Sequence, residues 1–210
     1  MKSPSPGSAI ALTGGIACGK SSVGEQLRAR GWPVLDTDKV AHEAMRAGTP
    51  VYRAIVDHFG TEILDPAGDI DRSALGRIVF GNDEQRKVLN GLVHPDVRKR
   101  WKAWLAEQRA GHPAVVVEIP LLFEIGAEAA GWDAIVCVAA GRETMLDRLR
   151  KRGIEGDEAL RRIESQWPVE EKMKRSDHVI VNDGSKEDLE RKINEVMKDI
   201  LNKEKREWPK

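Results

Sequence analysis

A phosphate-binding pattern lies in Ala9-Ile10-Ala11-Leu12-Thr13-Gly14-Gly15-Ile16-Ala17-Cys18-Gly19-Lys20-Ser21. An apolar stretch typical of a strand precedes the glycines, and a stretch compatible with a helix comes after them. Glycines let the backbone curl with its amides pointing inward, Lys20 brings a cation to the β- and γ-phosphates, and the Ser21 hydroxyl can bind magnesium. The positive end of the following helix adds to the attraction. The sequence therefore predicts a protein that binds a nucleotide.

The candidate nucleotide-binding residues all belong to this loop or adjoin it. They are Thr13, Gly14, Gly15, Ala17, Cys18, Gly19, Lys20, Ser21 and Ser22. Cys18 stands at a position where such loops accept almost any small residue. We interpret it as a spacer, and a reactive thiol is the alternative.

Composition indicates a globular protein with one main core. The chain has 210 residues, of which 40% are hydrophobic, and this is enough for a sizeable interior. Lys and Arg number 34 and Asp and Glu number 34, so there is no basic field that would favour nucleic acid. The two cysteines, Cys18 and Cys137, suggest neither a disulfide framework nor a metal-ligand cluster.

No run of the sequence approaches the roughly 18 apolar residues of a membrane span. The polar, proline-rich start does not have the pattern of a signal peptide. We therefore expect a soluble cytoplasmic protein with no nucleic-acid or membrane partner, present as a monomer or a weak homo-oligomer.

Five short apolar runs, rich in β-branched residues, alternate with helical stretches. They are Ala9–Thr13, Pro33–Leu35, Ala114–Glu118, Ala134–Ala139 and His178–Val181. The alternation predicts an α/β fold, in which a five-stranded parallel sheet carries helices on both faces. We expect one domain over residues 9–204. Its core comprises residues 9–36, 112–140 and 176–204, with a flexible leader at 1–8 and a charged tail at 205–210.

Two excursions interrupt this core. The first has 77 residues from Thr37 to Pro113, far more than a crossover needs, and we interpret residues 37–111 as a helical insertion. Within it, His94-Pro95-Asp96 predicts the start of a helix, because proline suits the first turn.

The second excursion, residues 141–175, carries basic side chains on two helical segments. They are Arg148, Arg150, Lys151, Arg152, Arg161 and Arg162. Such a helix pair can close over a nucleotide as a lid and neutralise charge on the transferring group. A solvated charged surface is the alternative.

Carboxylates lie at the ends of two of the strands. Asp36 and Asp38 come at the end of the second strand, on the sheet edge where the phosphate loop also lies. One of them can face an acceptor hydroxyl, orient the attacking oxygen and receive its proton late; a cap on the helix that begins near Lys39 explains the other. Glu118, after the third strand, either holds a magnesium-bound water or caps the next segment of the chain, and the sequence leaves both open.

Two other classes of nucleotide-binding protein are disfavoured. A GTPase needs Asn-Lys-x-Asp after a strand, and the chain lacks it. Asp65-Pro66-Ala67-Gly68 has the letters of a second GTPase motif, but it lies in a turn-rich stretch of the insertion. Motor ATPases and helicases generally need longer chains.

Several segments, in this order and spacing, resemble the dephospho-CoA kinase family. They are Ala11–Ile16 with Gly19–Ser21, Val34–Asp38, His94-Pro95, Ile119–Glu124 and Val181–Ser185. The resemblance implies a P-loop kinase that transfers the γ-phosphate of ATP to the 3′-hydroxyl of the ribose in dephospho-coenzyme A, the final step of coenzyme A synthesis, with Mg²⁺ as cofactor. It also implies three parts: a nucleotide-binding core, a helical acceptor-binding insertion and a lid.

The resemblance assigns roles to individual residues. Asp38 corresponds to the family's catalytic carboxylate, Lys20 and Ser21 to its phosphate and magnesium residues, and Arg148 to its lid arginine. Asn182 would border the adenine of ATP. The acceptor-binding residues would be Asp38, His42, Leu121 and Leu122.

The chain departs from the family pattern at three places. The family's loop commonly reads Gly-Ser where this chain has Ala17-Cys18, an arginine is frequent at His42, and Trp167-Pro168 stands where a smaller residue is expected. A neutral histidine would hold an acceptor phosphate less firmly than an arginine. Two further hypotheses stay open: a different small-acceptor kinase, acting on a nucleoside monophosphate or a sugar, and a nucleotide-dependent switch that binds a protein.

Overall fold

A computed structural model describes residues 7–206, with side chains through Asn202. The chain divides into two compact units. The first combines the residues up to Leu35 with those from Leu105 onward, and the second is Asp36–Trp104. The predicted leader lies mostly outside the described residues, except that Ser8 already belongs to the first strand.

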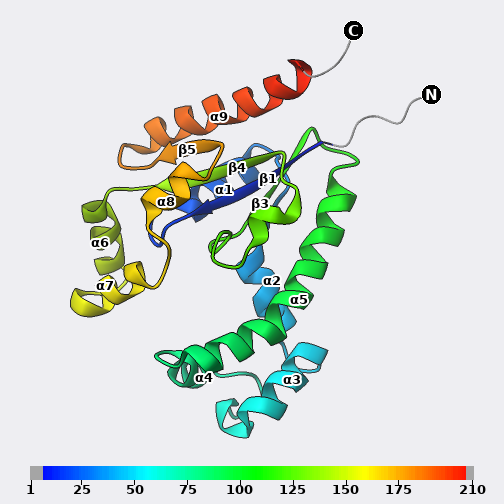
Figure 1. Ribbon diagram of the computed structural model, residues 1–210, viewed down its shortest axis with the longest axis vertical. Coiled ribbons are helices and arrows are strands. Elements are labelled where there is room, and N and C mark those ends of the chain that lie inside the picture. The colour runs from blue at the N-terminus through cyan, green and yellow to red at the C-terminus, as the bar shows by residue number, and fades with distance from the viewer. Residues whose placement is uncertain (1–6, 207–210) are drawn as a thin grey trace. The chain divides into compact units, whose positions relative to one another are not determined.

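A five-stranded sheet forms the centre of the first unit, in the order β2-β3-β1-β4-β5 (Figure 1). The strands are β1 Ser8–Gly14, β2 Val34–Asp36, β3 Ala114–Glu118, β4 Ala134–Ala139 and β5 His178–Val181. Strand β1 pairs in parallel with β3 and β4, and β4 pairs in parallel with β5. The predicted parallel α/β fold is therefore confirmed, and three of the five strands have the predicted bounds.

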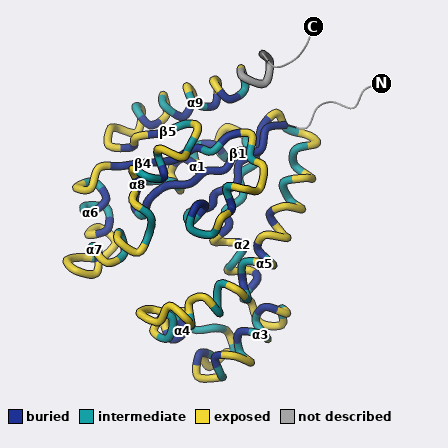
Figure 2. The backbone as a smooth tube through the Cα atoms, viewed as in Figure 1, coloured by how far each residue is buried: buried dark blue, intermediate teal, exposed yellow. Residues whose placement is uncertain are grey.

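Helices cover both faces of the sheet. Helices α1 (Lys20–Ala29) and α9 (Lys186–Arg206) lie on the face that presents Ile10 and Leu12, where Leu27 and Ile193 join the same apolar cluster. Helix α8 (Val169–Lys174) packs against β1 and β4. The central strands β1, β3 and β4 are almost entirely buried between these layers (Figure 2), because the crossovers of a parallel sheet place helices over its faces. The edge strands β2 and β5 are only partly buried.

The basic excursion contains three helices instead of the predicted two. They are α6 Arg142–Arg150, α7 Gly156–Glu164 and α8. The third begins directly after Pro168, which is its N-cap residue, with φ −52° and ψ 136°. Trp167-Pro168 therefore marks a joint between α7 and α8.

The second unit is helical. It contains α2 Thr37–Ala44, α3 Pro50–Phe59, a 3₁₀ turn at Thr61–Ile63, α4 Arg72–Val79 and most of α5, which spans Asp83–Gln108. Ile55 and Ile63 are fully buried in it. The turn-rich stretch is a closed turn, in which the Asp65 carboxylate accepts bonds from the amides of Ala67 and Asp69.

The prediction that a helix starts at His94-Pro95 is wrong. Pro95 lies inside α5, which begins eleven residues before His94 at Asp83. A proline inside a helix costs roughly 3 kcal/mol, because it removes one hydrogen bond and crowds the preceding turn. Val93, Val97 and Trp101 are buried on either side of it, and their packing offsets that cost. Trp101 is thus a core residue.

Helix α9 starts at Lys186, directly after Ser185, whose hydroxyl accepts a hydrogen bond from the Asp188 amide at 3.2 Å. It extends through Arg206, so the first part of the predicted tail is helical. The remainder, residues 207–210, lies outside the described part of the chain. Within residues 7–206, no helix combines the length and apolarity that crossing a membrane requires.

Candidate active site

The phosphate loop joins β1 to α1 through unusual backbone angles. Gly14 has φ 153° and Gly19 has φ 93°, and Ala17 lies in the left-handed region with φ 58°. Helix α1 starts at Lys20 and has no side-chain cap. Its first amides are thus not covered by a capping side chain, which is the arrangement that lets a helix start attract phosphate.

Asn182, which directly follows β5, is hydrogen-bonded to the phosphate loop. Its side-chain amide donates to the Cys18 carbonyl at 2.9 Å, and its backbone amide donates to the Ala139 carbonyl at 2.8 Å. A Cβ at Gly19 would lie 2.1 Å from the Asn182 amide nitrogen. Position 19 therefore excludes a side chain both by its backbone angle and by this close approach.

Arg148 ties the same two segments together from α6. One guanidinium nitrogen donates to the Ala17 carbonyl at 3.1 Å and the other to the Asn182 carbonyl at 2.8 Å. In a phosphate loop the amides serve the ligand, so a group bonded to the loop carbonyls supports the loop from behind. In this structure the guanidinium of Arg148 is therefore hydrogen-bonded to backbone carbonyls of the protein.

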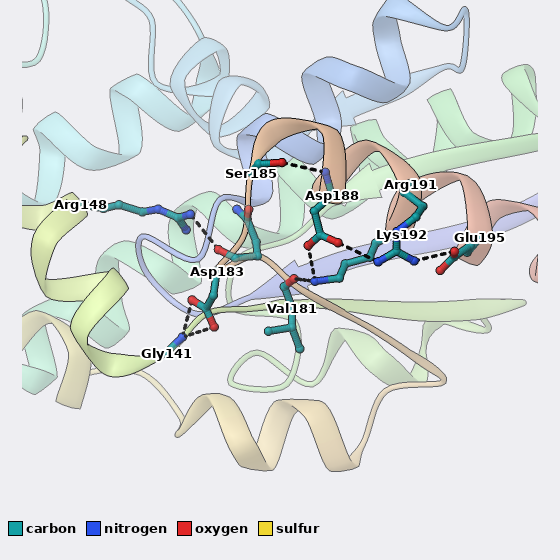
Figure 3. Close-up of polar contacts among 10 residues, drawn as sticks. Gly141, Arg148, Val181, Asp183, Ser185, Asp188, Arg191, Lys192 and Glu195 are labelled. Carbon is teal, nitrogen blue, oxygen red and sulfur yellow. Dashed lines mark hydrogen bonds and ion pairs between the residues drawn. The ribbon is translucent and has the colours of Figure 1, made fainter.

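The segment after β5 is fixed by further polar contacts (Figure 3). The Gly141 amide donates to the Asp183 carboxylate at 2.9 Å, and Lys192 donates to the Val181 carbonyl at 2.8 Å. Asp188 bonds Lys192 and Arg191, and these bonds lower the pKa of its carboxyl. The loop that would border a bound base is thus held at both of its ends.

A pocket of about 300 Å³ opens between the phosphate loop and helices α6, α7 and α8. It is lined by Gly15, Ile16, Arg142, Met145, Ile163, Glu164, Gln166, Trp167, Pro168, Val169 and Glu170. The Ile16 amide donates to the Gln166 side chain at 3.0 Å. Sequence reasoning missed Gln166, whose polar side chain carries no signal of this long-range contact.

Cys18 is a buried spacer in this structure. Its sulfur lies 3.6 Å from that of Met145, and burial raises the pKa of the thiol. Burial likewise raises the pKa of Cys137 to about 12. A thiol with a raised pKa is a poor nucleophile at neutral pH, which supports the interpretation made from sequence.

Glu118 faces α1. Its carboxylate accepts from Arg28 at 2.7 Å, and a Cβ at Gly24 would lie 2.0 Å from it. The side chain is only 4% exposed. This ion pair favours a structural role for Glu118, which fastens β3 to α1.

A buried ion pair connects the loop after β3 to α8. Lys172 is 2.7 Å from Glu124 and donates to the Pro120 carbonyl at 3.2 Å, which also accepts from the Thr13 hydroxyl. Glu124 in turn accepts from the Trp167 amide at 3.0 Å. Sequence reasoning did not anticipate this network, although Glu124 lies in one of the segments that carry the family resemblance.

The remaining predicted residues differ in exposure. Ser21 and Ser22 are exposed in the first turn of α1, and Leu121 is half-buried. Leu122 has 0% exposure, so it packs in the interior and has no surface to offer an acceptor.

The two aspartates belong to the second unit. Asp36 caps α2, because its carboxylate accepts from the amides of Asp38 and Lys39. Asp38 lies in the first turn of that helix. The helix cap thus accounts for the first carboxylate, as the sequence suggested.

The protein side chains fit magnesium bound together with a nucleotide. No cluster of three or more metal-binding side chains occurs among the residues that the structure describes. Magnesium in phosphate-transfer sites is held by one or two protein groups plus the phosphates. The exposed Ser21 hydroxyl at the start of α1 meets that requirement.

A sequence profile described as dephospho-CoA kinase matches residues 8–188. The chain belongs to the dephospho-CoA kinase family. The match confirms the resemblance seen in the phosphate loop and the later segments, and it covers both excursions from the sheet.

Curated relatives and solved structures agree with this family membership. Dephospho-CoA kinase from Geobacillus kaustophilus is 46% identical over 195 residues, covering 90% of this chain and 94% of the relative. One from Bacillus cereus is 47% identical over 180 residues, covering 84% and 88%.

Among solved structures, a Thermus thermophilus protein has a TM-score of 0.80 at 38% identity, covering 93% of this chain and 98% of its own. Dephospho-CoA kinase from Campylobacter jejuni has a TM-score of 0.63 at 30% identity, covering 92% and 97%. Shikimate kinase from Acinetobacter baumannii, at 14% identity and a TM-score of 0.52, is similar to this chain in fold.

Proposed function

We propose that this protein transfers the γ-phosphate of ATP to the 3′-hydroxyl of the ribose of dephospho-CoA and so forms coenzyme A. The observation that carries the proposal is family membership over residues 8–188 together with a phosphate loop of the required backbone geometry. The loop supplies the nucleotide site, and the helical insertion gives the chain a separate part for an acceptor.

On this proposal the triphosphate lies along the loop amides and the start of α1. Lys20 contributes a positive charge to the β- and γ-phosphates. The Ser21 hydroxyl would hold Mg²⁺, and the bound ion would supply positive charge that neutralises the phosphate oxygens. Asn182 and the segment after β5 border the base.

We assign Asp38 the role of catalytic carboxylate. Phosphoryl transfer has a loose transition state, so its contribution is to orient the acceptor hydroxyl and take the proton late. Asp38→Asn should lose most of the turnover while ATP binding is retained. Glu43→Gln, an exposed carboxylate on α2, is the matched control, and full activity of Asp38→Asn would remove Asp38 from catalysis.

We assign Arg148 a supporting role in place of the lid-arginine role. Its two hydrogen bonds to the Ala17 and Asn182 carbonyls support this assignment, since both hold the loop. A bidentate guanidinium provides that geometry better than a lysine does. Arg148 is therefore a positioning residue for the nucleotide site.

Purified protein, ATP, Mg²⁺ and a panel of acceptors test the function directly. Dephospho-CoA should be phosphorylated with a far higher kcat/KM than nucleoside monophosphates or sugars, and the product should carry a 3′-phosphate. Preference for another acceptor would favour a different small-acceptor kinase. ATP binding without transfer to any hydroxyl compound would favour a nucleotide-dependent switch.

A further inference from the structure

A second pocket lies wholly within the helical unit, where the end of α2 meets the start of α4. Its volume is about 380 Å³, within the roughly 300–1,000 Å³ of small-molecule sites. It is lined by His42, Met45, Arg46, Ala47, Asp69, Ile70 and Arg72. Three of these seven side chains are basic and only one is acidic.

The two arginines of this pocket have no carboxylate partner among the described residues. Two other arginines of the same unit do have such a partner: Arg86 lies 2.8 Å from Asp83 and Arg100 lies 2.5 Å from Asp96. Two unpaired guanidinium groups on one pocket repel each other, and Asp69 offsets only part of that charge. A pocket of this kind is completed by an anion.

His42 positions one of the two cations. A guanidinium nitrogen of Arg72 is in hydrogen-bond contact with the Nδ1 atom of His42. Because arginine is only a donor, Nδ1 is the accepting atom of this contact. His42 therefore orients Arg72, which comes from the first turn of α4.

We propose that this pocket binds the 5′-diphosphate of dephospho-CoA through Arg72 and Arg46. The planar guanidinium fork matches phosphate oxygens. The diphosphate carries the negative charge of this acceptor, whereas the phosphate loop of the other unit serves the triphosphate of ATP. Met45, Ala47 and Ile70 supply apolar surface for the carbon chain that continues from the diphosphate. The inference rests on the proposed function and names the part of the acceptor that the helical unit recognises.

Steady-state kinetics of Arg72→Gln and Arg46→Gln test the proposal. Each change should raise KM for dephospho-CoA about tenfold or more, the loss expected for a charge-assisted hydrogen bond. The values of kcat and of KM for ATP should stay within about twofold, because neither residue touches the transferring group. His42→Ala should raise KM for dephospho-CoA less than Arg72→Gln does, since it frees the guanidinium without removing it.

Arg77→Gln is the matched control, because Arg77 is an exposed basic residue on α4 outside this pocket. It should leave KM for dephospho-CoA unchanged. If Arg77→Gln raised KM for dephospho-CoA as much as Arg72→Gln does, the effect would reflect general attraction by positive charge, and the proposal would be overturned. Unfolding curves that match the wild type ensure that each variant is folded.

Calorimetric titration of the full chain with dephospho-CoA, without ATP, gives a second measurement. Arg72→Gln should bind about tenfold or more weakly than the wild type, and Arg77→Gln should bind equally well. The failure of the proposed function and the failure of the pocket assignment give different results. A wild type that neither binds nor phosphorylates dephospho-CoA refutes the proposed function. If the wild type is active and both Arg72→Gln and Arg46→Gln keep its KM and affinity for dephospho-CoA, only the pocket assignment is refuted.

Discussion

Lys172 and Glu124 form an ion pair of 2.7 Å in which the lysine side chain has 0% exposure and the glutamate 15%. A buried charge without a partner is costly, so each of these groups depends on the other. Through Pro120, Thr13 and the Trp167 amide, the pair connects the base of the phosphate loop, the segment after β3 and the entry to α8.

Lys172→Met should destabilise the protein by about 3–5 kcal/mol, because it leaves the Glu124 carboxylate buried without a counter-charge. Urea unfolding followed by circular dichroism measures the loss. Lys174→Met is the control, since Lys174 pairs with Glu171 on the exposed side of the same helix, and it should change stability little.

The double variant Lys172→Met/Glu124→Gln should recover a large part of that loss, since it removes both charges. A double variant no more stable than Lys172→Met would contradict the idea that the uncompensated carboxylate causes the damage.

Ala17→Gly should leave stability unchanged or raise it by up to about 1 kcal/mol. Alanine at φ 58° bears roughly 1–2 kcal/mol of left-handed strain, whereas added freedom of the unfolded chain costs glycine about 0.4–1 kcal/mol. Thermal unfolding compares it with Ala11→Gly, a buried β1 position without positive φ, which should lose roughly 0.5–1 kcal/mol. Equal destabilisation at both positions would show that Ala17 is unstrained.

Arg148→Ala should raise KM for ATP about tenfold or more while kcat changes little, because two charge-assisted bonds that shape the loop are lost. Initial rates at varied ATP separate the two parameters. A fall in kcat of about 10³ at unchanged KM would instead indicate an arginine that acts on the transition state. Arg150→Ala, an exposed neighbour on α6, should change neither.

His94 should make the protein less stable in mild acid. Burial, together with the nearby charge of Arg98, lowers the pKa of its imidazole from 6.5. The unfolded state then binds the proton more readily, so stability falls as the pH drops through 6.5 and toward the lowered value. Unfolding free energies at pH 7.5 and 5.5 should differ less in His94→Gln than in the wild type. An identical difference in both proteins would count against the lowered pKa.

Local sequence patterns, which extend over only a few residues, predicted much of the fold. Runs such as Ala114–Glu118 and Ala134–Ala139 are continuous apolar strands with polar or glycine borders, and the structure has both with the predicted bounds. The backbone requirement at position 17 also had a signal, since the family commonly has glycine where this chain has Ala17 with positive φ.

Long-range contacts could not be read from the sequence. Pro95 was predicted to start a helix because proline favours the first turn. That local preference contains no information about the residues on both sides of Pro95, which pack into one core. Lysine is almost never fully buried unless paired, and nothing near Lys172 in the chain marks Glu124, 48 residues away, as its partner. The sequence singled out Arg148, but the carbonyls that it bonds lie 131 and 34 residues away.

The insertion departs from β2, the outermost strand, and the chain returns to the sheet in β3, the strand next to it. The two junctions of this module therefore lie at neighbouring strands on one side of β1, and exchanging it would leave the β3-β1-β4-β5 ladder unbroken. Evolution, or a protein engineer building chimaeras, could replace the acceptor module while the nucleotide machinery is inherited unchanged.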